Sequence, residues 1–230
     1  MQSPIPEPWG SPDWTFWRYN PGRKAGSVVA NPRRGGGVVQ AVNPAGIVTL
    51  AEEAGAMVEM VPAIGEFVPT GAPLFRVSEP TGTYDVRRLL GFVALGDERT
   101  VRQDPSYAFR VLVDIAIRAL SPGINDPTTA LEALYRIEDL LLLLGTRQLP
   151  DGLFCGGDGE IRFVYRTPTW HQYLSLALTE IRTFGANAPT VVEQMRRLLD
   201  ELRALVPSWR HAALNEQSWL LEEAAAKARG

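Results

Sequence analysis

The second half of the chain has the hydrophobic period of α-helices. Four segments open with a polar or small residue followed by proline, and apolar residues then recur three or four positions apart. Two openings, Asp104-Pro105 and Asp126-Pro127, place aspartate at the N-cap and proline at the first helical position. A break at residues 152–164 indicates a small hairpin. With the C-terminal tail, the pattern predicts five helices, over residues 105–120, 127–145, 168–185, 189–206 and 208–229.

Residues 37–80 follow a strand pattern instead. Short apolar runs predict three strands and one short helix, over residues 38–42, 57–61, 75–77 and 44–54. The turn sequence Gly65–Leu74 resembles turns of lipoyl-like and barrel-sandwich modules. A module of that kind carries a lysine at a hairpin tip when it bears a cofactor, and no lysine lies between Gly35 and Val77. We therefore expect neither lipoylation nor biotinylation.

Residues 1–36 show neither period. They combine five aromatic residues with five prolines: Trp9, Trp14, Phe16, Trp17, Tyr19, Pro4, Pro6, Pro8, Pro12 and Pro21. Two interpretations stay open, an irregular arm whose rings pin it onto the domain and an anchor for a partner or a membrane interface. The whole chain is then an α+β protein, with an arm at 1–36, a small barrel-sandwich-like β-rich module at 37–80 and an all-helical domain at 81–230.

Composition narrows the possible partners and compartments. The 230 residues are 45% hydrophobic with a formal net charge of -3, which argues against nucleic-acid binding because phosphates require a basic excess. The single cysteine, Cys155, excludes an internal disulfide framework and fits a reducing compartment. The longest apolar run, Leu140–Leu144, is far shorter than the roughly 20 residues that cross a bilayer. We expect a soluble, cytoplasmic chain that does not insert into membranes by itself.

A charged stripe runs along the predicted helix 105–120. Arg110, Asp114 and Arg118 are spaced four residues apart, and the other positions are apolar nearly all round. A helix of this kind is typical of a core, so we expect the stripe to be buried and paired. It is either a structural row of ion pairs or a site in which spare guanidinium groups bind an anion. In the buried row, Asp114→Asn is expected to cost about 3–5 kcal/mol.

The turn after this helix carries more polar chemistry than a helix connection needs. Residues 121–129 contain Ser121, Asn125, Asp126, Thr128 and Thr129. A helix N-terminus there suits an anion, whereas the oxygen atoms suit a hard cation, although they are too few for a metal site. The polar loop 96–104 lies at the other end of the same helix, roughly 23 Å away. The candidate ligand-binding residues are Arg99, Asp104, Arg110, Asp114, Arg118, Ser121, Asn125, Asp126 and Thr129.

Catalytic patterns are missing from the sequence. His171 and His211 have no second ligand at metal spacing, and Cys155 has no histidine near it. The chain contains no phosphate-binding glycine loop and no nucleophile elbow. We therefore expect no catalytic residues, no metal and no cofactor, and the sequence favours a protein that is not an enzyme.

The stretch Leu112–Pro127 closely resembles the core motif of a bacterial "predicted membrane protein" family, domain of unknown function 2254. Further matches are Arg99-Thr100, Gln103-Asp104, Thr129-Ala130, Gly37–Val42, Gly65–Val68, Gly71, Ile181-Arg182 and Phe184-Gly185. The resemblance covers about residues 35–206. It implies relatives in which several N-terminal transmembrane helices precede this soluble region, and it brings no established activity.

Two functions remain. The first is a non-enzymatic regulatory or assembly domain that forms a homo-oligomer and, in membrane-anchored relatives, lies close to a membrane or a membrane-protein partner. The second is a small-ligand or ion-binding protein, with or without hydrolytic activity, that uses the charged stripe and the turn 121–129. A pocket joining those polar groups favours the second, and mutual satisfaction by salt bridges and caps favours the first.

Overall fold

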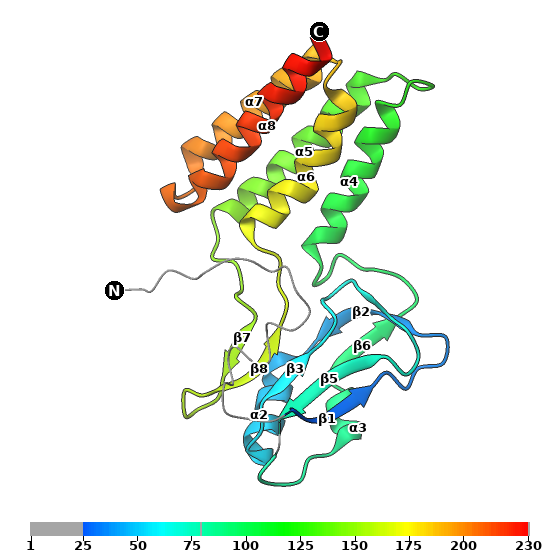
Figure 1. The fold of residues 1–230 in the computed structure, drawn as a ribbon, viewed down its shortest axis with the longest axis vertical. Coiled ribbons are helices and arrows are strands. Elements are labelled where there is room, and N and C mark those ends of the chain that lie inside the picture. Colours follow the sequence, from blue (N-terminus) through cyan, green and yellow to red (C-terminus); the bar gives the residue numbers. More distant parts are fainter. Residues whose placement is uncertain (1–24, 79, 230) are drawn as a thin grey trace. The chain divides into compact units, whose positions relative to one another are not determined.

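The structure is a computed structural model that describes residues 25–78 and 80–229 (Figure 1). These residues form helices and two sheets, which confirms the α+β class. They divide into two compact units. The first contains the chain up to Glu98 together with Asp151–Thr167, and the second contains Arg99–Pro150 with Pro168–Gly230. The expectations for the aromatic arm at residues 1–24 lie outside the described residues.

The first unit contains two sheets. The five-stranded sheet has the order β1 (Ala25–Ala30), β5 (Pro73–Ser78), β3 (Val58–Met60), β8 (Ile161–Tyr165) and β7 (Leu153–Cys155). The three-stranded sheet has the order β4 (Phe67–Val68), β2 (Gly37–Val42) and β6 (Val93–Gly96). Only β3 and β8 pair in parallel among these described strands. The helices of this unit are α2 (Pro44–Ala54) and α3 (Val86–Leu90).

The core of the first unit lies on one face of the five-stranded sheet. Val58 and Met60 of β3 and Phe163 of β8 point to this face and join apolar residues of both helices and of the three-stranded sheet. Because strand residues alternate between faces, Glu59 and its register partner Val164 point to the opposite face. Helix α2 is well defined at both ends, since Asn43 caps its first turn and Gly55 ends it in the left-handed conformation at φ 59°.

The unit boundaries differ from those that periodicity predicts. Residues 81–98 and 151–167 pack with the first unit, although we expected them in a helical domain at 81–230. The hairpin at 152–164 does form, but its strand β8 pairs with β3, far away in the sequence, and such pairing leaves no local signal. Residues 25–30 form β1 instead of continuing an irregular arm. The barrel-sandwich likeness of the β-rich module stays a prediction.

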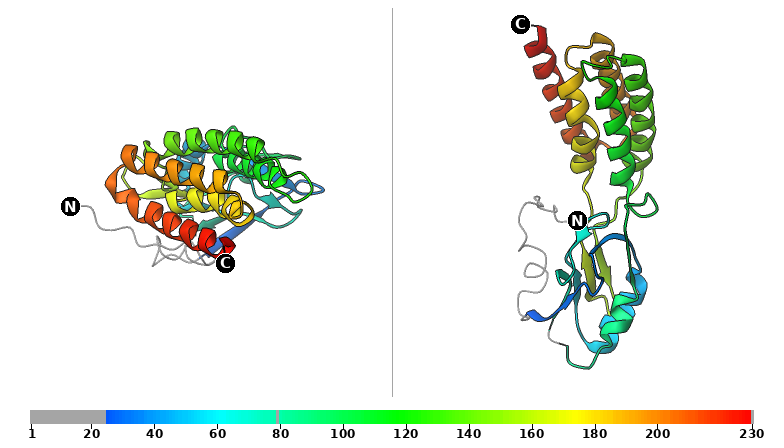
Figure 2. Two further views of the ribbon diagram at one scale, coloured as in Figure 1. Left: turned by 90° about the horizontal axis from the view of Figure 1, so that it is seen from above. Right: turned by 90° about the vertical axis from the view of Figure 1, so that its right-hand side faces the viewer.

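The second unit is a bundle of the five predicted α-helices (Figure 2). They are α4 (Pro105–Ala119), α5 (Pro127–Gly145), α6 (Trp170–Gly185), α7 (Pro189–Leu205) and α8 (His211–Arg229), with a 3-10 turn η1 (Ser208–Arg210). Helix α4 packs against α5 and α6, and α8 packs against α6 and α7. Helix α6 begins two residues later than expected, because Thr169 and Gln172 form a capping box.

Candidate functional site

Asp104 anchors the start of α4. One of its carboxylate oxygens accepts the N–H of Tyr107 at 3.1 Å. The other accepts Nε and Nη2 of Arg99 at 2.9 and 2.7 Å. The Asp104 side chain is only 4% exposed, and the Arg99 guanidinium also lies over the Tyr107 ring, 5.2 Å from its centre. These two candidate residues therefore bind each other and fasten the preceding loop to the helix.

Arg110 is held between two carboxylates. Its Nε and Nη2 donate to Asp114 at 2.8 and 2.6 Å, and its Nη1 and Nη2 donate to Glu180 of α6 at 2.5 and 3.0 Å. The hydrogen bonds to Glu180, and then those to Asp114, raise the pKa of Arg110, while the bond from Arg110 lowers the pKa of Glu180. Glu180 was not singled out in the sequence, because its partner lies seventy residues away.

We expected the charged stripe to be buried, but the structure leaves it half-exposed. Side-chain exposure is 35% for Arg110, 46% for Asp114 and 38% for Glu180. Arg118 is exposed, and it makes no side-chain hydrogen bond or ion pair with the described part of the chain. Helix α4 lies at the edge of the bundle and buries four residues, Phe109, Val113, Ala116 and Ala119. Among the other apolar positions, Leu112 and Ile117 are half-buried against the core, whereas Val111 and Ile115 are exposed to solvent.

Asp114→Asn is expected to cost less than about 1 kcal/mol, as for a solvated ion pair. Arg110 keeps Glu180 in this variant, so no guanidinium loses its last partner. Asp114→Asn/Glu180→Gln removes both partners and is expected to cost more than the two single changes combined. Urea denaturation of the three variants measures the coupling between the two carboxylates. A loss of several kcal/mol for Asp114→Asn alone would contradict the half-exposed stripe.

The polar turn 121–129 works as a helix connection. Asp126 accepts the N–H of Thr129 at 3.2 Å and its hydroxyl at 2.6 Å, and these bonds lower the pKa of Asp126. The Ser121 hydroxyl donates to the carbonyl of Arg118 at 2.8 Å, which closes the end of α4. Asn125 adopts a left-handed conformation at φ 48°, which asparagine tolerates better than most residues. The candidate oxygens of Ser121, Asp126 and Thr129 are thus engaged in caps.

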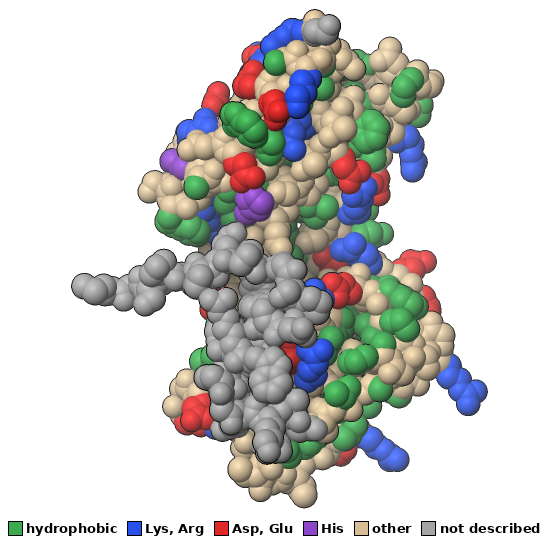
Figure 3. All heavy atoms as spheres, in the orientation of Figure 1, with side chains coloured by type: hydrophobic (Ala, Val, Ile, Leu, Met, Phe, Trp, Pro, Cys, Tyr) green, Lys and Arg blue, Asp and Glu red, His purple; other side chains and the backbone are tan. Residues whose placement is uncertain are grey.

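A groove of about 210 Å³ lies between α7 and α8, away from these residues. It is lined by Arg196, Leu199, Asp200, Arg203, Ser218, Leu221 and Glu222. Arg196 binds Glu222 at 2.6 Å, and Arg203 binds Asp200 at 2.7 Å, so its cations are paired. Acidic and basic side chains are mixed on the face of the helical unit seen in Figure 3. Within residues 25–78 and 80–229, no three His, Cys, Asp or Glu residues are grouped as a metal site.

One buried acid, Glu138 of α5, was not among the residues singled out in the sequence. Its side chain accepts Nε2 of Gln194 at 3.3 Å, and the residue is 8% exposed. Burial, together with a hydrogen bond to Glu201 of α7 and repulsion from that carboxylate, raises the pKa of Glu138 to about 7. A signal was present, because Glu138 falls on the buried side of α5 with Leu134 and Leu141.

Comparison with known proteins gives one family. The family model described as "Predicted membrane protein (DUF2254)" matches residues 18–201. The chain is 32% identical over 196 residues to uncharacterized proteins of Mycobacterium bovis and of Mycobacterium tuberculosis strain H37Rv. This alignment covers 82% of the chain and 38% of each relative. A third uncharacterized protein, of M. tuberculosis strain CDC 1551, is 33% identical over 72% of the chain.

The chain spans only 38% of the length of these mycobacterial relatives. No solved structure matches it. Across the residues that the structure describes, none of the helices has the length and hydropathy to span a bilayer. The family match contains the Asp104–Asp126 segment, whose geometry is described above. The chain belongs to the DUF2254 family of predicted membrane proteins.

Proposed function

We propose that this chain is a non-enzymatic assembly domain of its family, which self-associates through the outer face of α4. One observation supports this proposal: two charged side chains of α4 are paired, whereas two apolar side chains of the same helix are exposed to solvent. Arg110 and Asp114 are paired within the protomer, whereas Val111 and Ile115 are 40% and 43% exposed. Exposed apolar side chains that lie together on one surface are typical of interfaces.

The same contacts disfavour ligand binding at the candidate residues. An anion would have to compete with Asp114 and Glu180 for Arg110, and with Asp104 for Arg99. A cation would have to take Asp126 from Thr129. These charged side chains are paired within the protomer, so they hold the helices of the bundle together. An assembly domain requires such a stable bundle.

The exposed apolar residues around α4 suit a two-fold axis. Val111 and Ile115 lie two residues to either side of Val113. Val101, in the loop before α4, is 62% exposed, and Ile124, in the turn after it, is 55% exposed. These two residues are nearly equally far from Val113 along the chain. In an antiparallel pair of α4 helices, Val111 contacts Ile115 of the second copy, and Val101 approaches Ile124. One operator thus brings four exposed side chains of each copy toward the interface.

Val111→Glu/Ile115→Glu is expected to convert the oligomer to a monomer, because burying four carboxylates at the two-fold axis opposes association. Light scattering after size exclusion at micromolar concentration measures the mass. Leu143→Glu on α5 is the matched control, since Leu143 is 44% exposed and outside α4. A monomeric wild-type chain, or the same mass change in the control, contradicts the proposal.

A further inference from the structure

Two opposite charges on the outer side of α4 are not used within the protomer. Arg118 is exposed, and its side chain forms no hydrogen bond or ion pair with the described residues. Asp114, one turn earlier, is bound through one oxygen only. Arg110 donates both of its hydrogen bonds to Oδ1, and Oδ2 accepts none from the part of the chain that the structure describes. A free cation and a free carboxylate oxygen therefore lie on one helix without binding each other.

The surroundings of Asp114 favour a second cation. We define the Arg110 cluster as Arg110, Asp114 and Glu180. One guanidinium and two carboxylates leave this cluster a formal net charge of -1. The Asp114 side chain is 46% exposed and that of Glu180 is 38% exposed, so a guanidinium from outside the protomer can approach. Arg118 of a second copy has the charge that balances the cluster.

We propose that Arg118 of each copy binds Asp114 of the other, and that these two ion pairs fix the register of the α4 dimer. The inference rests on the proposed function, in which two antiparallel α4 helices are centred on Val113. In that arrangement Arg118 lies level with Ala108 of the second copy, six residues or about 9 Å along the axis from its Asp114. Helical side chains lean toward the N-terminus of their own helix. Antiparallel helices lean in opposite directions, so the two side chains converge across this offset.

Both charges also lie on the same flank of the apolar contact. Arg118 follows Val111 by slightly less than two turns and Asp114 follows it by slightly less than one, whereas Ile115 follows it by slightly more than one turn. Asp114 and Arg118 are therefore displaced to one side of Val111, and Ile115 to the other. A two-fold axis perpendicular to the helices keeps each flank on the same side in both copies. The ion pairs thus border the apolar contact, as charged positions border the seam of a coiled coil.

Exchanging the charges tests the pairing. Arg118→Glu is expected to raise the dissociation constant of the dimer at least about tenfold, because two attractive contacts become repulsive. Asp114→Lys is expected to do the same. An equimolar mixture of the two variants should restore the dimer, since the introduced glutamate then faces the introduced lysine and Arg118 faces Asp114. Sedimentation equilibrium measures the mass of each variant and of the mixture.

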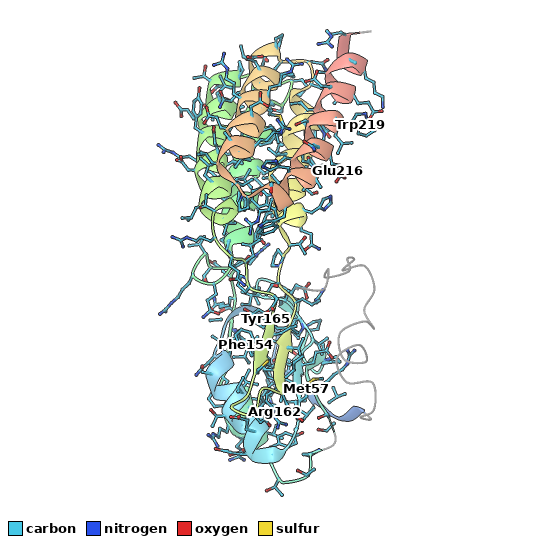
Figure 4. The ribbon with its side chains drawn as sticks, turned by 90° about the vertical axis from the view of Figure 1, so that its left-hand side faces the viewer. Met57, Phe154, Arg162, Tyr165, Glu216 and Trp219 are labelled. Carbon is cyan, nitrogen blue, oxygen red and sulfur yellow. The ribbon has the colours of Figure 1, made fainter. Side chains whose placement is uncertain are left out.

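The matched controls lie on α8, which packs against α6 and α7 (Figure 4). Glu216 is 49% exposed and bound to one cation partner, His171, so Glu216→Lys matches Asp114→Lys. Lys227 is 73% exposed, and Lys227→Glu matches Arg118→Glu. Both controls should keep the mass of the wild type, and mixing them should change nothing. Circular dichroism confirms that each variant is folded.

The outcomes separate this inference from the proposed function. A wild-type dissociation constant for Arg118→Glu overturns the ion pair, although the apolar contact still stands if Val111→Glu/Ile115→Glu gives monomers. A mixture that stays monomeric while both variants are folded overturns it as well. Arg118→Glu decides alone if Asp114→Lys does not fold, because Arg118 has no partner among the described residues of its own copy. A monomeric wild type contradicts both proposals.

Discussion

Asp104→Ala is expected to lower the free energy of unfolding of the helical unit by about 2–4 kcal/mol. The change removes an N-cap, worth about 0.5–2 kcal/mol. It also removes two charged hydrogen bonds from Arg99 to a carboxylate that is 4% exposed, and hydrogen bonds to charged groups contribute about 1.5–3 kcal/mol. The loop before α4 loses its attachment as well. Chemical denaturation followed by circular dichroism measures the loss.

Two comparison variants separate these causes. Asp104→Asn keeps an oxygen for the Tyr107 N–H but removes the charge that binds Arg99, so its cost reports the ion pair. Asp126 caps α5 from an Asp-Pro sequence like that of Asp104, but it forms no ion pair with an arginine of the described chain. Asp126→Ala is therefore expected to cost less than Asp104→Ala. Equal losses for Asp104→Ala and Asp126→Ala would show that the Arg99 pair contributes nothing.

The stability of the helical unit is expected to fall by about 3 kcal/mol between pH 4.5 and 7 through Glu138. Burial and the neighbouring Glu201 raise the pKa of Glu138 from 4.5 to about 7. Below pH 4.5 the carboxyl is protonated in both the folded and the unfolded chain. Across the window only the unfolded chain releases the proton, so rising pH favours unfolding. Above pH 7 the folded chain holds a buried carboxylate, and the full loss is reached.

Glu138→Gln is expected to remove this pH dependence and to stabilise the protein at pH 8 by about 2–3 kcal/mol, because the neutral amide still bonds Gln194 and Glu201. Urea denaturation at pH 4.5, 6 and 8 gives both curves, and their difference isolates the one group. Glu132→Gln, at an exposed position of the same helix, is the control and should follow the wild type. A wild-type curve parallel to that of Glu138→Gln would refute the buried acid.

Local signals predicted the helices well. Asp104 and Asp126 cap their helices as the sequence indicated, because an N-cap, a following proline and the apolar period all lie within one or two turns of chain. The family motif, read from the same stretch, was confirmed by the family match. These features depend on residues that are neighbours in the sequence, so a single sequence is enough to predict them.

Features that depend on distant residues were not predictable in this way. Glu180 of α6 forms an ion pair with Arg110 of α4, and β8 pairs with β3 although three helices lie between these strands in the sequence. The expected burial of Arg118 was wrong because its exposure depends on where α4 sits in the bundle. An edge helix and a central helix with the same composition differ only in how many neighbours cover them. Hydrophobicity alone therefore overstated the burial of α4.

The insertion of the β7–β8 hairpin between α5 and α6 has a consequence for synthesis on the ribosome. β3 and β8 are separated by roughly a hundred residues, so their pairing closes a long loop that contains the three helices α3, α4 and α5. The strands of the first unit are incomplete until β8 has been synthesised, at a point when the helices α6, α7 and α8 are still to be translated. Neither unit is one continuous stretch of chain, and the two must mature in an interleaved order instead of one after the other.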